Sequence, residues 1–384
     1  MATGITERRD VVPPLARTIQ GRVFWQPRKW TFWAYVGLVI ASTVPWFGIA
    51  FYPAGALPWG VTAVSVAATA ALGVLLVLLI RSLDVHRGIP APLLVAAFVW
   101  GALVATGWAV VANDQVFGVA SKVLGAATGA RWEASISAPV VEESLKAIGT
   151  ATVLLIGREF VRRPAHGMFI GAFCGLGFQL VEDVLYAVQS AFSPDASSDA
   201  AAVAPVIGGR TLTALDSHWL YSAVTGLALG YALTRRDRSW PRRLLVAAAL
   251  FLVAWWMHFL SDSPIPGGAL GIVTKTVLNL LLGFVVYRIA MRAEWRHYAA
   301  TVDGEPDEII SRAEVESMRT HRGRRRVRKR YRRHGGKPAK RAARQLQRAQ
   351  LELANDLETD PAAAARTRAA ILNLRSRLPG ARAD

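Results

Sequence analysis

Apolar runs of about 20 residues recur along most of the chain and constrain its fold more than any other feature. A helix of that length crosses about 30 Å of hydrocarbon, and a chain inside lipid must satisfy its backbone hydrogen bonds internally. The runs lie at residues 32–53, 60–80, 91–112, 137–157, 167–189, 211–233, 242–262 and 269–290. They predict an all-α, polytopic membrane protein built as a bundle of about eight transmembrane helices.

The positive charge, formally +18 in total, is distributed unevenly. Basic residues accumulate in the N-terminal segment and in the second, fourth and sixth loops between the runs. They are Arg8, Arg9, Arg17, Arg22, Arg28 and Lys29; Arg81 and Arg87; Arg158, Arg162 and Arg163; and Arg235, Arg236, Arg238, Arg242 and Arg243. Because Lys and Arg accumulate in cytoplasmic loops, this alternation predicts a multi-pass protein of the cell membrane with both termini in the cytoplasm. The high Ala and Arg content is typical of a GC-rich bacterium.

Composition divides the chain into three parts. Residues 1–31 form a basic cytoplasmic segment without a signal-peptide pattern, residues 32–290 the transmembrane domain, and residues 291–384 a basic cytoplasmic tail. Residues 319–348 of the tail contain 15 Lys or Arg and no acid. They favour contact with anionic lipid headgroups, at about 1 kcal/mol per residue, and nucleic acid is the alternative partner. Helically spaced leucines and the helix-start pair Asp360-Pro361 predict a helical hairpin after an irregular linker over 293–318.

Ionisable residues inside the apolar runs are costly and usually functional, and five of them stand out as candidates for a site. They are Glu142, Glu143, Glu182, His218 and His258. With the alternating topology and a rise of 1.5 Å per residue, all five fall roughly 6–11 Å below the outer face. We therefore expect them to surround one cavity, as in a hydrolytic centre inside the membrane. A proton-coupled transporter or a scaffold is the alternative, although no inverted repeat of the common transporter kind is visible.

Helical spacing predicts partners for these groups. Lys146 follows the glutamate pair at i+3 and i+4, Asp262 follows His258 at i+4, and Phe178 and Tyr186 lie one turn on either side of Glu182. Gly171 and Gly175 form a GxxxG face that allows close helix packing.

Four motifs in chain order carry a resemblance to a known family. They are VEESLK at 141–146, GAFCGLGFQLVEDVLY at 171–186, His218 with Gly226 downstream, and HFLSD at 258–262. Over residues 35–290 the chain resembles the PrsW family of intramembrane proteases, which is similar to the group containing CAAX prenyl endopeptidases and bacteriocin-processing membrane proteases. Asp183 departs from the Asn that commonly follows the motif glutamate in this family.

The resemblance implies an intramembrane endopeptidase that cleaves a membrane-anchored protein, such as an anti-sigma factor, near the extracytoplasmic side. Two chemistries fit the residues. Glu182, His218 and His258 are candidate ligands of Zn²⁺. Without metal, Glu142 or Glu143 would activate water, the two histidines would polarise the scissile carbonyl, and Glu182 would orient a histidine or the water. The sequence favours the metal-free chemistry, because it has no HExxH spacing and the ligands would come from three separate helices.

Overall fold

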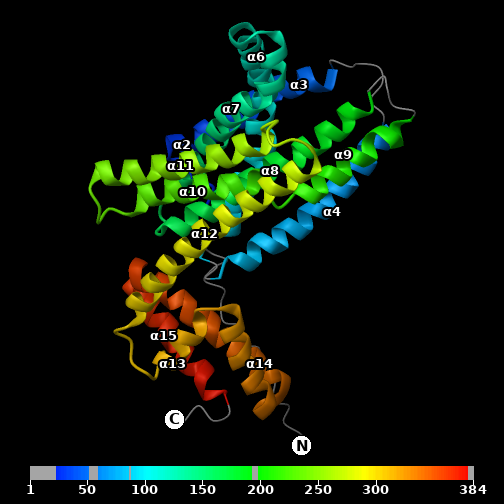
Figure 1. Ribbon diagram of the computed structural model, residues 1–384. Coiled ribbons are helices and arrows are strands. Elements are labelled where there is room, and N and C mark those ends of the chain that lie inside the picture. Colours follow the sequence, from blue (N-terminus) through cyan, green and yellow to red (C-terminus); the bar gives the residue numbers. More distant parts are fainter. Residues whose placement is uncertain (1–22, 52–58, 86–87, 193–197, 379–384) are drawn as a thin grey trace, which may run out of the picture. The chain divides into compact units, whose positions relative to one another are not determined.

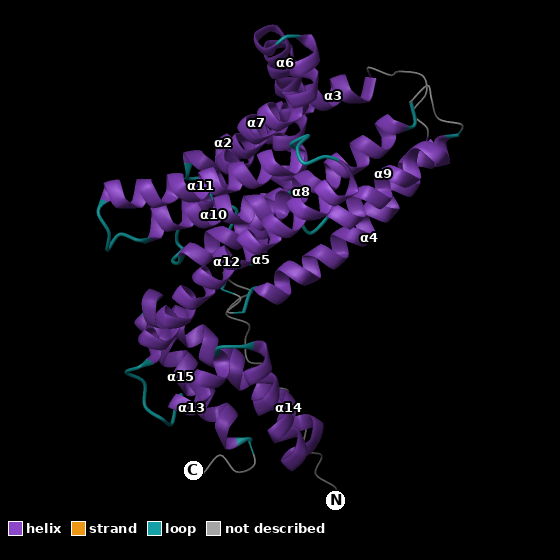
Figure 2. Cartoon of the chain, in the orientation of Figure 1, coloured by secondary structure: helices purple, strands orange, loops and turns teal. Residues whose placement is uncertain are grey.

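The computed structural model describes residues 23–51, 59–85, 88–192 and 198–378. Throughout these ranges the regular structure is helical and no strand is found, which confirms the all-α prediction (Figure 2). Residues 1–22, with Arg8, Arg9, Arg17 and Arg22, lie outside the described ranges, as do loop residues 54–58 and Arg87. The chain forms two compact units, one of residues 1–73 and 89–280 and one of residues 74–88 and 281–384.

The predicted apolar runs coincide with helices (Figure 1). These are α2 (Trp30–Ala41) with α3 (Thr43–Phe51), α4 (Trp59–Leu83), α5 (Ala91–Val99) with the π-helical turn η1 (Trp100–Ala105) and α6 (Thr106–Leu124), α7 (Ala126–Ile156), α8 (Pro164–Ser190), α10 (His218–Thr234), α11 (Trp240–Asp262) and α12 (Gly268–Val302). Six helical stretches among the described residues are long and apolar enough to cross a membrane. The helices α7 and α10 lie outside that set. Helix α7 carries the charged glutamate pair and Lys146, which make it too polar, and α10 is too short with its 17 residues.

Two predicted boundaries are wrong. The expected loop 113–136 is a helical hairpin: α6 runs to Leu124, Gly125 turns the chain with a φ of 82°, and α7 begins at Ala126. A positive φ favours glycine at this turn. The expected run 211–233 is interrupted, because the additional helix α9 (Asp199–Thr213) ends inside it and α10 begins only at His218. Asp216 and Ser217 precede α10, and such short polar residues favour helix starts over helix interiors.

The glycine face of α8 packs directly against the backbone of α10. A Cβ atom at Gly171 would lie 2.0 Å from the carbonyl oxygen of Ser222, and one at Gly175 would lie 2.2 Å from that of His218. Gly226 on α10 approaches Gly167 in the same way. The predicted close packing is therefore confirmed, and it sets the position of the first turn of α10.

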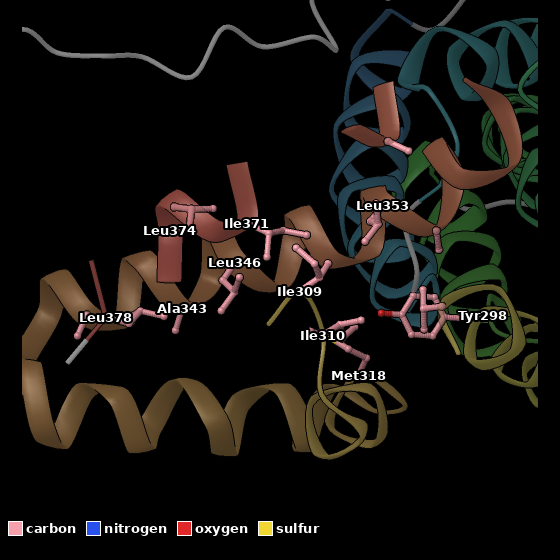
Figure 3. Packing of buried hydrophobic residues seen from close by; sticks show 14 residues of the cluster. Tyr298, Ile309, Ile310, Met318, Ala343, Leu346, Leu353, Ile371, Leu374 and Leu378 are labelled. Carbon is pink, nitrogen blue, oxygen red and sulfur yellow. The ribbon is translucent and has the colours of Figure 1, made fainter. Parts of the chain in front are cut away.

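The second unit contains a folded helical bundle. It comprises the end of α12, α13 (Arg312–Met318), α14 (His321–Thr359) and α15 (Pro361–Ser376). The bundle core is apolar (Figure 3), with buried Tyr298, Val302, Ile309, Ile310, Met318, Ala339, Ala343, Leu346, Leu353, Ala354, Ala364, Ile371, Leu374 and Leu378. The predicted linker over 293–318 is wrong for most of its length, because α12 continues to Val302 and α13 begins at Arg312.

The basic segment of the tail folds back on itself inside α14. Backbone angles leave the helical region at Gly335 and at Gly336, where φ is 67°. Beyond this reversal Gln347 donates a hydrogen bond of 3.2 Å to the carbonyl oxygen of Arg324, so the two arms of α14 lie against each other. Asp360 accepts a bond of 2.8 Å from the Ala362 amide and begins α15, in agreement with the predicted helix start.

Candidate active site

The five ionisable residues predicted from the sequence converge within the first unit. They come from α7, α8, α10 and α11, which contact one another around the buried start of α10 (Figure 1). The side chains of Glu142 and Glu143 are 4% and 0% exposed and that of Glu182 is 12% exposed. Both histidines are buried. Burial of so many ionisable groups is costly unless they are paired, and each of them has a charged or hydrogen-bonding neighbour here.

His258 is held by two acidic residues. Its Nδ1 lies 3.1 Å from Glu143 Oε1, and its Nε2 lies 3.3 Å from Asp262 Oδ2, the i+4 partner that helical spacing predicts. The ring also stacks on Tyr221, with centroids 5.3 Å apart. Because a carboxylate only accepts hydrogen bonds, the contact with Glu143 places a proton on Nδ1. By the same rule Nε2 faces the carboxylate of Asp262, so it can bind a cation only if Asp262 gives up that contact.

His218 has a defined tautomer as well. Lys146 Nζ lies 2.9 Å from its Nδ1, and Glu182 Oε2 lies 2.8 Å from its Nε2. An ammonium group only donates, so Nδ1 accepts from Lys146 and Nε2–H donates to Glu182. The ring of Phe178 packs 4.8 Å from the imidazole ring. Phe178, which helical spacing placed one turn from Glu182, thus packs against His218.

Lys146 is the buried cation of the site. Its Nζ lies 2.7 Å from Glu143 Oε1 and 3.6 Å from Glu142 Oε2, and it sits 4.3 Å from the centre of the Phe178 ring. The pairing with both glutamates agrees with the predicted i+3 and i+4 contacts. One ammonium group therefore compensates part of the negative charge of the glutamate pair.

Glu142 presents one free oxygen to the two histidines. Its Oε1 accepts a hydrogen bond of 3.0 Å from Asn113 Nδ2. Its Oε2 is buried without a hydrogen-bond partner, 3.7 Å from His218 Nδ1 and 3.8 Å from His258 Nε2. Lys146 approaches this oxygen to 3.6 Å but does not hydrogen-bond it. A buried carboxylate oxygen that accepts no hydrogen bond is costly and indicates a site for a cation or a proton donor.

Glu182 is tied to helix α9 through Arg210. The guanidinium group of Arg210 pairs with Glu182 through Nη2 and with Asp183 through Nε, and its Cζ lies 5.0 Å from the Tyr186 ring centre. Asp183, the departure from the family pattern, thereby has a charge partner. Tyr186 was predicted as a supporting residue, and its ring contacts the guanidinium group of Arg210.

Several residues at the site escaped the sequence analysis. Asn113 and Arg210 fell in predicted loops, where polar residues are ordinary. Tyr221 lies three residues after His218, and its hydroxyl donates 2.9 Å to Asp216 Oδ1. A tyrosine one turn from a predicted site histidine was an available signal, whereas Asn113 and Arg210 carried none.

The donor atoms of Glu142, His218 and His258 fit a divalent metal ion. One atom from each residue lies within 4.8 Å of the others. The histidine nitrogens nearest Glu142 Oε2 are Nδ1 of His218 and Nε2 of His258, and the opposite nitrogens bond Glu182 and Glu143. Metal-binding histidines commonly have such carboxylate partners. Metal binding would require Lys146 to give up its bond to His218 Nδ1 while keeping Glu143, and Asp262 to give up its contact with His258 Nε2. The carboxylate in this donor set is that of Glu142, whereas the sequence suggested Glu182 as the third ligand beside the two histidines.

Residues 89–291, more than half of the chain, match a family described as PrsW family intramembrane metalloproteases. The matched range contains all five buried ionisable residues. No curated protein and no solved structure matches the chain significantly.

Proposed function

Because the chain belongs to the PrsW family of intramembrane metalloproteases, we propose that the cluster of Glu142, His218 and His258 is its catalytic centre. The observation that carries the proposal is the Oε2 of Glu142, which accepts no hydrogen bond and lies between the two imidazoles. We therefore propose metal-dependent chemistry in place of the metal-free chemistry that the sequence favoured. The argument against a metal rested on the missing HExxH spacing and on ligands from three separate helices. The fold nevertheless brings donor atoms of Glu142, His218 and His258, from three helices, within 4.8 Å of one another.

Zn²⁺ is the ion we propose, since two histidines and one carboxylate with room for water are a typical catalytic zinc set. Bound there, the ion would polarise the scissile carbonyl and lower the pKa of its water. Glu143 and Glu182 hold the far nitrogens of the histidines and so orient the rings. Lys146 keeps Glu143 in place.

We assign the proton transfers to Glu182 rather than to the glutamate pair. Glu143 is fully buried and bonded to Lys146 and His258, and Glu142 belongs to the donor set, whereas Glu182 is the most exposed of the three carboxylates. Its Oε1 would accept a proton as the water oxygen attacks the peptide carbonyl carbon. The same oxygen would return that proton to the leaving nitrogen as the C–N bond breaks.

Two glutamine variants and one control test these roles. Glu142→Gln removes a ligand and should abolish stoichiometric Zn²⁺ binding. Glu182→Gln should still bind Zn²⁺ at saturating concentration, yet lose about 10²–10⁴-fold in kcat, the usual contribution of a general base. Glu133→Gln changes a carboxylate of α7 outside the cluster and should leave both unchanged. Wild-type zinc content in Glu142→Gln, or full activity in Glu182→Gln, contradicts the corresponding assignment.

The substrate we propose is a membrane-anchored regulatory protein such as an anti-sigma factor, cut near the extracytoplasmic side. This side follows from the proposed topology, with both termini in the cytoplasm of a bacterial cell, which rests on the alternation of Lys and Arg among the loops. Reporter fusions at residues 200 and 300 should report opposite compartments. Signals from the same compartment would contradict the topology.

We also propose that the basic arms of α14 contact anionic lipid headgroups. Their exposed cations include Arg322, Arg325, Arg326, Lys329, Arg330, Arg332, Arg333, Lys337, Lys340, Arg341 and Arg344. None of these side chains forms an ion pair with another described residue. Burial, together with neighbouring Arg344, Arg348 and Arg325, lowers the pKa of Arg328, which reflects this crowding of positive charge.

Vesicle binding tests the lipid contact. The intact protein in detergent should bind vesicles containing phosphatidylserine and not vesicles of phosphatidylcholine alone. Binding should weaken as salt rises, since charges are screened beyond about 8–10 Å. Preference for duplex DNA or RNA over anionic vesicles would favour the nucleic-acid alternative.

A further inference from the structure

Asn113 and Ser137 form a short hydrogen-bonded chain that ends on Glu142. Ser137 Oγ donates to Asn113 Oδ1 over 2.7 Å, and Asn113 Nδ2 donates to Glu142 Oε1 over 3.0 Å. Ser137 is fully buried on α7, and Asn113 comes from the neighbouring helix α6. Neither residue belongs to the motifs that identify the family.

The chemistry at both ends fixes the direction of this chain. An ionised carboxylate has no donor, so the amide of Asn113 must turn its NH₂ group toward Glu142. Its carbonyl oxygen then faces Ser137, whose hydroxyl is able to donate. The amide is thus anchored on both sides and does not rotate freely.

A carboxylate is planar, so holding one oxygen determines where the other points. With Oε1 bonded to Asn113, Oε2 of Glu142 lies 3.7 Å from His218 Nδ1 and 3.8 Å from His258 Nε2, buried and without a hydrogen bond of its own. We propose that Asn113 and Ser137 are positioning residues that direct Glu142 Oε2 toward the metal. This inference rests on the proposed metal site. Neither side chain touches substrate in this role.

Removing such an outer partner commonly weakens metal affinity about 10–100-fold. Asn113→Leu keeps a side chain of similar size and removes both hydrogen bonds. Ser137→Ala removes one hydroxyl and leaves Asn113 in place, so its effect should be smaller. The double variant should be no worse than Asn113→Leu alone, because both residues act through the single bond to Glu142.

A matched control, Thr106, lies on α6 two turns before Asn113. Thr106 is buried and donates a side-chain hydrogen bond of 2.9 Å to the carbonyl oxygen of Gly101. Thr106→Val loses one buried hydrogen bond, as Ser137→Ala does, but touches no residue of the donor set. It should lower thermal stability without changing zinc affinity.

The experiment measures the Zn²⁺ dissociation constant of each full-length purified variant by competition with a chromophoric chelator, and Tm alongside it. We expect Kd to rise about 10–100-fold in Asn113→Leu and to stay at the wild-type value in Thr106→Val. An unchanged Kd in Asn113→Leu, or an equal rise in Thr106→Val, overturns the proposal. If Asn113→Leu does not fold, an unchanged Kd in Ser137→Ala overturns it. Failure of the wild type to bind zinc instead refutes the metal site itself.

Discussion

Substituting Gly175 by alanine tests whether the contact between α8 and α10 positions His218, a residue of the proposed catalytic centre. A Cβ atom there would lie 2.2 Å from the carbonyl oxygen of His218, whereas ordinary contact begins at 3.4 Å. The backbone of His218 would have to move by about 1.2 Å, because a carbonyl oxygen has no flexible side chain to yield. Overpacking of this kind costs about 1–3 kcal/mol of stability. A 1 Å displacement of a catalytic group can cost about 10²-fold in rate.

Two further alanine variants separate site distortion from loss of stability. Gly167→Ala makes a similar clash, 2.2 Å from the carbonyl oxygen of Gly226, two turns away from His218. It should lose comparable stability and much less activity. A Cβ atom at Gly37 on α2 would meet nothing within 4 Å, so Gly37→Ala should be neutral or stabilising by about 0.5–1 kcal/mol.

The assay compares kcat on a membrane-anchored model substrate in proteoliposomes with Tm measured in detergent. The reasoning predicts about a 10²-fold loss of kcat in Gly175→Ala at a temperature where the protein remains folded. Wild-type kcat in Gly175→Ala would refute it. Equal losses of kcat in Gly175→Ala and Gly167→Ala would show that general destabilisation, not displacement of His218, is responsible.

Three other outcomes are expected. A strong chelator should abolish cleavage and added Zn²⁺ should restore it, because the proposed donor set needs the ion; activity that survives exhaustive chelation would contradict the metal assignment. Arg210→Gln should lower kcat/KM about 10-fold or more, since Arg210 holds Glu182, the proposed base, and outer partners of this kind commonly contribute about 10–100-fold; Arg210→Lys should retain more activity in the same kinetic assay. Leu353→Ala should destabilise the C-terminal bundle by about 2–5 kcal/mol, seen as faster proteolysis of the tail, with cleavage of the model substrate unchanged.

Sequence reasoning identified the groups from which the site is built. Burying an ionisable side chain in lipid is so costly that Glu182 or His258 inside an apolar run indicates function without any knowledge of the fold. Contacts within one helix were equally accessible. Lys146 with Glu143 and Asp262 with His258 follow from helical spacing alone, and the structure contains both.

The C-terminal tail shows where composition misleads. Its spaced leucines predicted a helical hairpin, but the charged residues 293–318 before it suggested an irregular linker. In the structure, apolar residues at regular spacing among the charges, such as Ala343, Leu346 and Leu353, form a buried core with Tyr298 of α12. Charge dominates the average over such a segment, whereas folding depends on which face the few apolar residues share.

The sequence alone determined the helical class, the apolar runs, the buried ionisable residues and the family. Only the tertiary structure decided which of these groups face one another. Asn113 reaches Glu142 across 29 residues and Arg210 reaches Glu182 across 28, on helices whose rotation no local pattern specifies. Packing of α8 against α10 places Glu182 beside His218, whereas contact of α6 with α7 and of α8 with α9 places Asn113 beside Glu142 and Arg210 beside Glu182. Local periodicity reports which face of a helix is buried, and contact between helices is needed to say against what.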